Sequence, residues 1–120
     1  GFAVWVLGGP SEQEIANVIC ARGRYGRDVT GHDLRDAILA LAAADVAVSN
    51  DSGLLHVAAA IGTPAIGLFG PTSPWHWAPL NPIAATIEAP WPHGVKGDVR
   101  ERTTADITVG KVLRAVKRAL

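Results

Sequence analysis

A short polar run between two apolar segments carries the residues best suited to bind a phosphate group. Asp51, Ser52 and Gly53 follow one apolar stretch and precede an alanine-rich one with the composition of a helix. The first amide groups of a helix have no intrahelical partners, and a glycine lets an anion approach them closely. His56 lies one helical turn after Ser52, so its imidazole can donate to the same anion. The run therefore predicts a phosphate or diphosphate site.

Asp51, the acidic residue of this run, is not expected to bind the phosphate. A carboxylate facing a phosphate would repel it, so Asp51 is better suited to accept hydrogen bonds from sugar hydroxyls beside the anion. The spacing alone is equally consistent with a structural interpretation, in which Asp51 or Ser52 caps the helix and His56 is a solvated surface histidine.

The polar run is positioned by a regular alternation of expected strands and helices. Extended apolar stretches are each followed by a turn and then by apolar residues at helical spacing. The expected strands are 3–7, 28–30, 45–49, 64–69 and 84–88, and the expected helices are 12–22, 34–44, 52–61 and one capped by Thr108. This alternation predicts an α/β fold, a Rossmann-like doubly wound parallel sheet covered on both faces. The polar run then lies at the carboxyl edge, where such folds bind ligands.

Local signals refine this outline. Ser11 and Glu14 have the spacing of a capping box for the first helix. Residues 89–106 are rich in proline, glycine and charge and lack periodicity, so we expect a mobile loop. The last helix has an apolar stripe and a basic face, which is best interpreted as solvated.

The overall composition limits the classes of function. The 120 residues fit one domain with a single core, and 48% apolar with 18% charged residues indicates a globular chain. Eleven basic residues balance eleven acidic ones, which argues against a nucleic-acid partner. Cys20 has no mate, as expected in the cytoplasm, and we predict neither a metal site nor a cofactor. The start lacks Met and the features of a signal peptide, so we expect a truncated chain.

The longer pattern around the polar run resembles one known enzyme family. In residues 48–60, an aspartate, a small hydroxyl residue, a glycine and a histidine precede an alanine-rich helix, and residues 68–74 form a Gly-Pro loop. This closely resembles glycosyltransferase family nine, in particular lipopolysaccharide heptosyltransferases of the heptosyltransferase II group. The resemblance runs from the glycine turn at Gly8 to the start of the last helix, apart from residues 89–102.

The resemblance implies an enzyme with two facing Rossmann-like halves. The N-terminal half would bind the lipid A core acceptor, and the C-terminal half would bind ADP-heptose. Residues 1–120 resemble only the C-terminal half, so we expect them to form a single, N-terminally truncated domain. The implied reaction is inverting transfer of heptose to the lipopolysaccharide inner core, by a cytoplasmic enzyme with at most a peripheral contact with the inner membrane. Since the general-base aspartate belongs to the other half, we expect the chain alone to be inactive.

The resemblance also implies roles for individual residues. Asp51 falls on the donor-sugar contact, Ser52 and Gly53 on the diphosphate-binding amides, and His56 on a histidine that stabilises the leaving group. The remaining implied donor-binding residues are Glu12 or Glu14 for the ribose, His32 for the adenine, and Gly70 and Thr72 in the Gly-Pro loop. The alternatives to these binding roles are purely structural: the glutamates belong to the capping box of the first helix, and His32 is a solvated surface residue.

Two tryptophans follow the Gly-Pro loop. Trp75 and Trp77 could close over the sugar or contact the other half of the enzyme, but large aromatic side chains usually bury themselves, here on the base of their own loop.

Two other functions fit the short motif. A sugar-nucleotide epimerase of similar two-domain build also uses a helix start after an acidic-serine-glycine turn. A non-catalytic nucleotide-binding Rossmann-like module would need only the strand, turn and helix.

Overall fold

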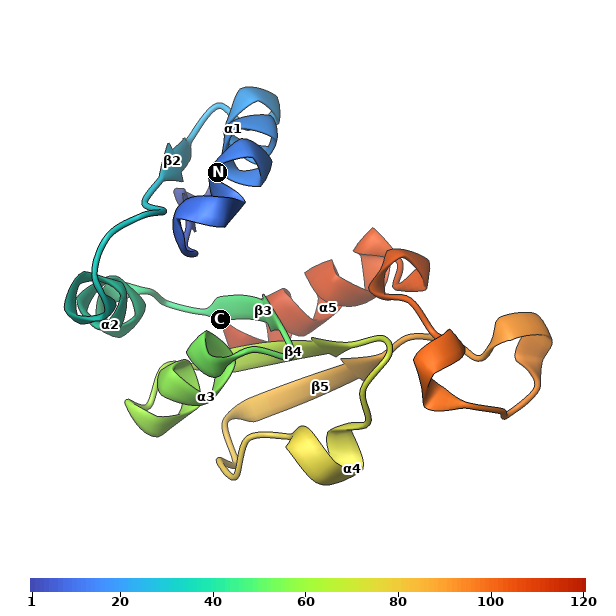
Figure 1. Cartoon of the computed structure of the whole chain (residues 1–120). Coiled ribbons are helices and arrows are strands. Elements are labelled where there is room, and N and C mark those ends of the chain that lie inside the picture. The colour runs from blue at the N-terminus through green and yellow to red at the C-terminus, as the bar shows by residue number, and fades with distance from the viewer. The chain divides into compact units, whose positions relative to one another are not determined.

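A computed structural model describes residues 1–120, except for the side chain of Trp77. The chain forms two compact units, Gly1–Ala40 and Leu41–Leu120, each of which is described by itself. The strands pair in parallel and alternate with helices along the chain, so the α/β prediction is confirmed (Figure 1). Hydrogen bonds group the five strands into a two-stranded and a three-stranded sheet. The prediction of a single domain stays a prediction.

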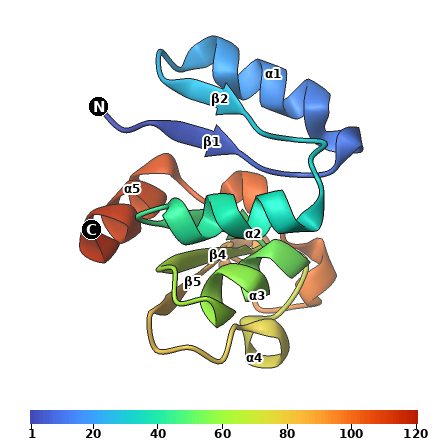
Figure 2. The ribbon, with the colours of Figure 1, turned by 90° about the vertical axis from the view of Figure 1, so that its left-hand side faces the viewer.

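The first unit is built from two strands and the helix that connects them. β1 (Val4–Val6) pairs with β2 (Gly26–Asp28), and α1 (Gln13–Arg22) lies along the pair (Figure 2). Gly26 permits this close packing, because a Cβ there would lie 2.9 Å from the Cα of Cys20 in α1. The next helix, α2 (Leu34–Ala43), contains the boundary between the two units.

Two local predictions in the first unit are wrong. Ser11 and Glu14 form no capping box, because the 3-10 turn η1 (Pro10–Glu12) precedes α1 and makes Glu12 its N-cap. The strand expected at 28–30 ends at Asp28 instead. The Asp28 carboxylate accepts hydrogen bonds from the N–H and the hydroxyl of Thr30, while the N–H groups of Val29 and Gly31 still donate to the carbonyls of Val6 and Gly8.

The second unit is a three-stranded sheet with helices on both faces. β4 (Ala65–Phe69) lies between β3 (Ala47–Asn50) and β5 (Ala84–Glu88), all in parallel. Figures 1 and 2 show α3 (Gly53–Ala60) and the short α4 (Pro74–Trp77) on one side of this sheet and α5 (Val109–Ala119) on the other. Because Asn50 pairs with Leu68, β3 and β4 end at the same edge.

The core of the second unit lies on both faces of the central strand, β4. Leu55 of α3 and Ile66 and Phe69 of β4 are each at most 1% exposed. The buried Thr63 hydroxyl donates to the carbonyl of Leu41 at 2.8 Å, which ties the end of α2 to the connection before β4. Thr108 caps α5 as predicted, with its Oγ1 accepting from the N–H of Lys111.

Segments predicted as loops contain short helical turns. Residues 74–77 form α4, and the 89–106 segment contains the 3-10 turns η2 (Pro92–Gly94), η3 (Val99–Glu101) and η4 (Thr104–Asp106). Turns of three or four residues are too short to produce the hydrophobic periodicity that reveals longer helices.

We predict that Gly67→Ala destabilises the second unit. A Cβ at Gly67 would lie 2.8 Å from side-chain atoms of both Leu55 and Phe69, which are fully buried and have no room to move. Overpacking of this kind costs about 1–3 kcal/mol, so the urea midpoint should fall. Gly110→Ala in α5 is the control, because its Cβ meets only the end of the Arg114 side chain and alanine favours helix. An unchanged midpoint for Gly67→Ala would contradict the packing argument.

Candidate functional site

The turn between β3 and α3 leaves the start of the helix without a side-chain cap. Ser52 is the N-cap residue in an extended conformation, but its hydroxyl makes no capping hydrogen bond. It lies instead 3.0 Å from the hydroxyl of Ser49, which donates to the carbonyl of Asn50 at 2.8 Å. The interpretation of Ser52 as a helix cap is therefore wrong, and the first amide groups of α3 are available to a ligand.

Asp51 does not cap the helix either. Its side chain is half-buried, and among the described residues its carboxylate takes part in no hydrogen bond or ion pair. Carboxylate oxygens without a protein partner remain able to accept hydrogen bonds from solvent or from a ligand. Asp51 is thus an acceptor held beside the start of α3 with its hydrogen-bonding capacity unused.

Gly53 is not required by packing. An ideal Cβ at this position would meet nothing within 4 Å, and the residue is exposed. Glycine is also a poor helix former, so its presence in the first turn brings no local stability. Open space in front of the first helical residue suits the close approach of an anion to the backbone.

His56 lies on the exposed side of α3, one turn after its start. It borders a hollow of about 310 Å³ whose other walls come from Ala59 and Ala60 of α3 and from the connection that leads into β5, residues 79–81. The helical residues that share this hollow with His56 lie one turn further along α3. His56 is exposed and, among the described residues, takes part in no hydrogen bond or ion pair, so its imidazole is free to contact a ligand.

The Gly-Pro loop follows the neighbouring strand at the same edge of the sheet. Because β3 and β4 are parallel neighbours with aligned ends, Gly70 and Thr72 follow β4 where the 51–53 turn follows β3. Trp75 is 88% exposed, so the interpretation that it packs on its own loop is wrong. The side chain of Trp77 lies outside the described residues.

In the first unit, Glu12 rather than Glu14 lies against the glycine turn that follows β1. An ideal Cβ on Gly9 would be 3.2 Å from Oε2 of Glu12, and one on Gly8 would be 3.0 Å from its Cβ. Glu14 is an exposed residue in the first turn of α1. Of the two candidates, Glu12 is therefore the one held at the end of a strand.

His32 lies in the first unit beyond the end of β2. Its Nδ1 is 3.5 Å from a carboxylate oxygen of Asp36, one turn away, and both side chains are about half exposed. Asp28 lies at the end of the same strand, and its hydrogen bonds from Thr30, helped by the nearby His32, lower the pKa of its carboxyl group. Three polar side chains, Glu12, Asp28 and His32, thus belong to the carboxyl ends of β1 and β2.

Comparison with known proteins identifies the family. The family model described as glycosyltransferase family 9 (heptosyltransferase) matches residues 1–103. The chain belongs to glycosyltransferase family 9. It is 35% identical to lipopolysaccharide heptosyltransferase 2 of Escherichia coli strain K12, over 100% of this chain and 38% of that protein. The predicted family is therefore confirmed.

Solved structures of heptosyltransferases have the same fold. One is described as E. coli ADP-heptose LPS heptosyltransferase II, with a TM-score of 0.77 and 30% identity over 99% of this chain and 36% of that one. Another, E. coli heptosyltransferase WaaC with ADP, has a TM-score of 0.84 and 24% identity over 100% of this chain and 35% of that one. This family 9 chain spans just over a third of the length of these relatives. Neither the epimerase nor the non-catalytic module gains support from them.

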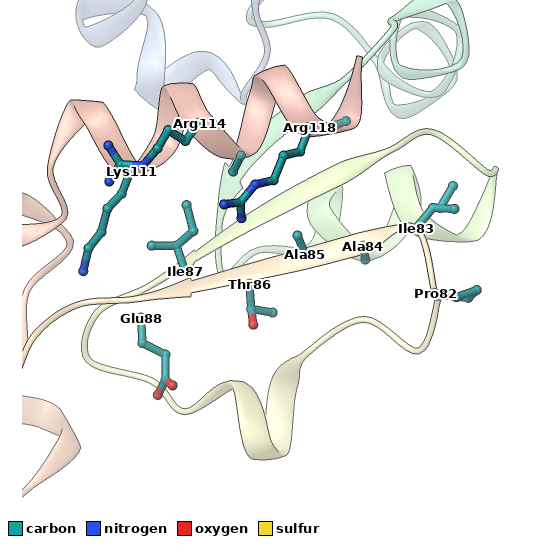
Figure 3. Close-up of a pocket in the computed structure, with 12 residues that line it drawn as sticks. Pro82, Ile83, Ala84, Ala85, Thr86, Ile87, Glu88, Lys111, Arg114 and Arg118 are labelled. Carbon is teal, nitrogen blue, oxygen red and sulfur yellow. The ribbon is translucent and has the colours of Figure 1, made fainter.

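A groove on the other face of the sheet contains none of the predicted site residues of this family 9 chain (Figure 3). It has a volume of about 520 Å³ and lies between β5 and α5, where Lys111, Arg114 and Arg118 of the helix border it. Lys111, Arg114 and Arg118 are exposed, as the solvated interpretation of the basic face predicts. None of the described helices is both long and apolar enough to cross a bilayer.

One residue beside the Gly-Pro loop was missed by sequence reasoning. Arg102 is buried in the 89–106 segment of this family 9 chain and donates to the carbonyl oxygens of Gly70 and Thr72. A lone arginine in a stretch without periodicity gives no sign of burial, because charged residues in loops are normally solvated. The side chain of Arg102 ties this segment to the Gly-Pro loop by hydrogen bonds, and the mobility of the rest of the segment stays a prediction.

We predict that Thr30→Val raises the pKa of the Asp28 carboxyl group toward its ordinary value. The hydroxyl of Thr30 is the main cause of the lowered pKa, and the backbone N–H of residue 30 remains as a smaller one. A lowered pKa stabilises the fold above the ordinary value of 3.8, and this contribution is lost as the pH falls through the lowered one. Carbon-13 NMR titration of the carboxyl group measures the shift. Thr30→Ser keeps the hydroxyl and should keep the pKa low; equal values in the two variants would contradict the assignment.

Proposed function

We propose that this chain is the donor-binding part of an inverting glycosyltransferase that transfers heptose from ADP-heptose to the inner core of lipopolysaccharide. The observation that carries the proposal is the uncapped start of α3 beside the unpaired carboxylate of Asp51. A relative of known structure that is 30% identical is described as an ADP-heptose LPS heptosyltransferase, which supports this choice of donor.

Different residues at the β3–α3 turn bind different parts of the donor. The amides of Ser52 and Gly53 bind the diphosphate, where the helix dipole and the open space favour an anion. Asp51 accepts hydrogen bonds from the heptose hydroxyls, and His56 donates to the phosphate side. Gly70 and Thr72 supply further donor contacts from the same edge of the sheet.

Glu12 and His32 are proposed to bind the nucleoside. The Glu12 carboxylate can accept the two ribose hydroxyls, because it is held against the glycine turn that follows β1. His32 is exposed at the end of β2 and offers a planar ring for the adenine. Both roles follow the pattern of ligand binding at the carboxyl ends of parallel strands.

The reaction needs this chain to stabilise a leaving group. The acceptor hydroxyl, deprotonated by a base outside these residues, displaces ADP at the anomeric carbon with inversion. Negative charge grows on the diphosphate as the glycosidic bond breaks, so amides at the start of α3 and the His56 donor bind the transition state more tightly than the ground state. The chain thus acts on the departing ADP and not on the acceptor.

The acceptor and the location of the enzyme follow from the same proposal. We infer that residues 1–120 act as one nucleotide-sugar-binding domain, and that the lipid A core binds to a part of the enzyme outside them. The enzyme then acts in the cytoplasm, and its contact with the inner membrane is at most peripheral. The basic face of α5, with Lys111, Arg114, Lys117 and Arg118, is the surface of this chain that could meet anionic lipid.

We predict that the 120-residue chain binds ADP-heptose more tightly than UDP- or GDP-sugars and turns none of it over. Calorimetric titration measures the affinities, and an assay for released ADP in the presence of acceptor measures turnover. Gly53→Ala should weaken ADP-heptose binding at least about tenfold without loss of stability, because its Cβ has room in the free chain but would meet the diphosphate.

Three results would decide against the proposal. Equal or tighter binding of a UDP- or GDP-sugar would contradict the assignment of ADP-heptose as the donor. Sugar transfer by the isolated chain would contradict the assignment of the catalytic base to a part of the enzyme outside residues 1–120. Unchanged affinity in Gly53→Ala would remove the diphosphate from the start of α3. Gly110→Ala, at an ordinary helical position in α5, is the matched control and should bind as the unsubstituted chain does.

We predict that His56→Ala in the intact enzyme lowers kcat about 100-fold, as loss of a transition-state donor does, and changes the donor Kd much less. His56→Gln keeps an N–H donor and should retain part of the activity. Steady-state kinetics with titrated ADP-heptose separates the two quantities. A rise in Kd with kcat unchanged would make His56 a ground-state contact, and wild-type turnover in His56→Ala would exclude it from the reaction.

A further inference from the structure

The segment after β5 contains a buried charge that the proposed reaction does not use. Arg102 is 4% exposed, although its neighbours Glu101 and Thr103 are exposed. Burying a guanidinium is costly unless its donors are paired. The partners of Arg102 therefore indicate what this charge holds in place.

All three nitrogens of the Arg102 guanidinium have acceptors. Nε donates to the carbonyl of Gly70 and Nη2 to the carbonyl of Thr72, both at 3.0 Å. Nη1 donates to Oε1 of Glu88 at 3.0 Å and to the carbonyl of Ala89 at 3.4 Å. Two of the three nitrogens thus bind the backbone of the Gly-Pro loop, while Glu88 balances the charge.

An aromatic ring and a close backbone contact complete the arrangement. The guanidinium carbon of Arg102 lies 4.8 Å from the centre of a Trp91 ring, within the range of a cation–π interaction. Gly70 has no room for a side chain, because an ideal Cβ would lie 2.5 Å from the N of Thr104 and 2.9 Å from the carbonyl carbon of Thr103. The loop is therefore held by Arg102 and by the backbone that follows it.

These contacts fix the direction of the peptide groups in the loop. In a trans peptide the C=O and the following N–H point in opposite directions. Since the Thr72 carbonyl points at Arg102, the N–H of Ser73 points away from it. A loop whose peptide groups are already oriented loses less conformational entropy when a ligand binds.

We propose that Arg102 is a positioning residue that holds Gly70–Thr72 ready to bind the nucleotide-sugar, so that the 89–106 segment sets donor affinity without touching the donor. This inference rests on the proposed function, because the loop's role as a donor-binding element is part of it. A purely structural Arg102 would stabilise the fold and leave the affinity of a folded enzyme unchanged.

The test uses the intact enzyme that contains this chain. Arg102→Gln removes the charge and the forked donors, and Arg102→Lys keeps the charge but reaches fewer acceptors. We expect both to raise the Kd for ADP-heptose about tenfold at temperatures well below unfolding, and to leave the acceptor KM unchanged. Without ligand, hydrogen exchange of the segment 70–77 should become faster. If Arg102→Gln does not fold, Arg102→Lys alone carries the test.

Thr63→Val is the matched control for stability. It removes a buried hydrogen bond before β4 and should lower the unfolding midpoint without changing the donor Kd or the exchange of 70–77. The proposal is overturned if folded Arg102 variants bind ADP-heptose as the unsubstituted enzyme does, or if Thr63→Val loses affinity to the same degree. A failure of the proposed function would show itself differently, because the unsubstituted enzyme would then not bind ADP-heptose. Unchanged hydrogen exchange of the segment 70–77 in the Arg102 variants would reject only the positioning role.

Discussion

The parallel pairing of β3 with β4 is the constraint on which the candidate site depends. Parallel neighbours with aligned ends deliver their following loops to one edge of the sheet, here the 51–53 turn and the Gly-Pro loop. The pairing holds because β4 is buried on both faces, with Leu55 of α3 packed against Gly67. The stability of this small core and the geometry of the edge are therefore the same property, since a shift of β4 would move Gly70 and Thr72 with it.

Much of this edge could be predicted from the sequence, because it depends on patterns with a long period. Apolar strands that alternate with helical spacing predicted each strand within a few residues, and the polar run between β3 and α3 was placed correctly at the start of a helix. The family could also be predicted, since its pattern covers the whole turn and the helix after it. Spacing alone could not decide whether Ser52 caps α3, because that depends on where its hydroxyl points. The structure answers this with the Ser49 contact.

What could not be predicted depends on contacts between residues far apart in the sequence or on single turns. Ser11 has the spacing of a cap, but Pro10 begins a 3-10 turn one residue earlier and changes its position. The partners of Arg102 include Gly70, 32 residues before it, and no local pattern reports such a pairing. Composition correctly predicted an irregular 89–106 segment, but irregular backbone is not the same as mobile backbone. The hydrogen bonds of the buried Arg102 guanidinium tie this irregular segment to the Gly-Pro loop, a contact that composition does not reveal.

The attachment of the 89–106 segment also limits how its length can vary among related proteins. Irregular surface segments usually accept insertions and deletions easily. Here Trp91 and Arg102 are joined by a cation–π contact, and Thr104 lies against Gly70. Between these anchors the exposed stretch around Gly94 has open space beside it. Length changes should therefore be tolerated between residues 92 and 101 and selected against from 102 to 104, so that one apparently uniform loop contains a variable part and a part of fixed length.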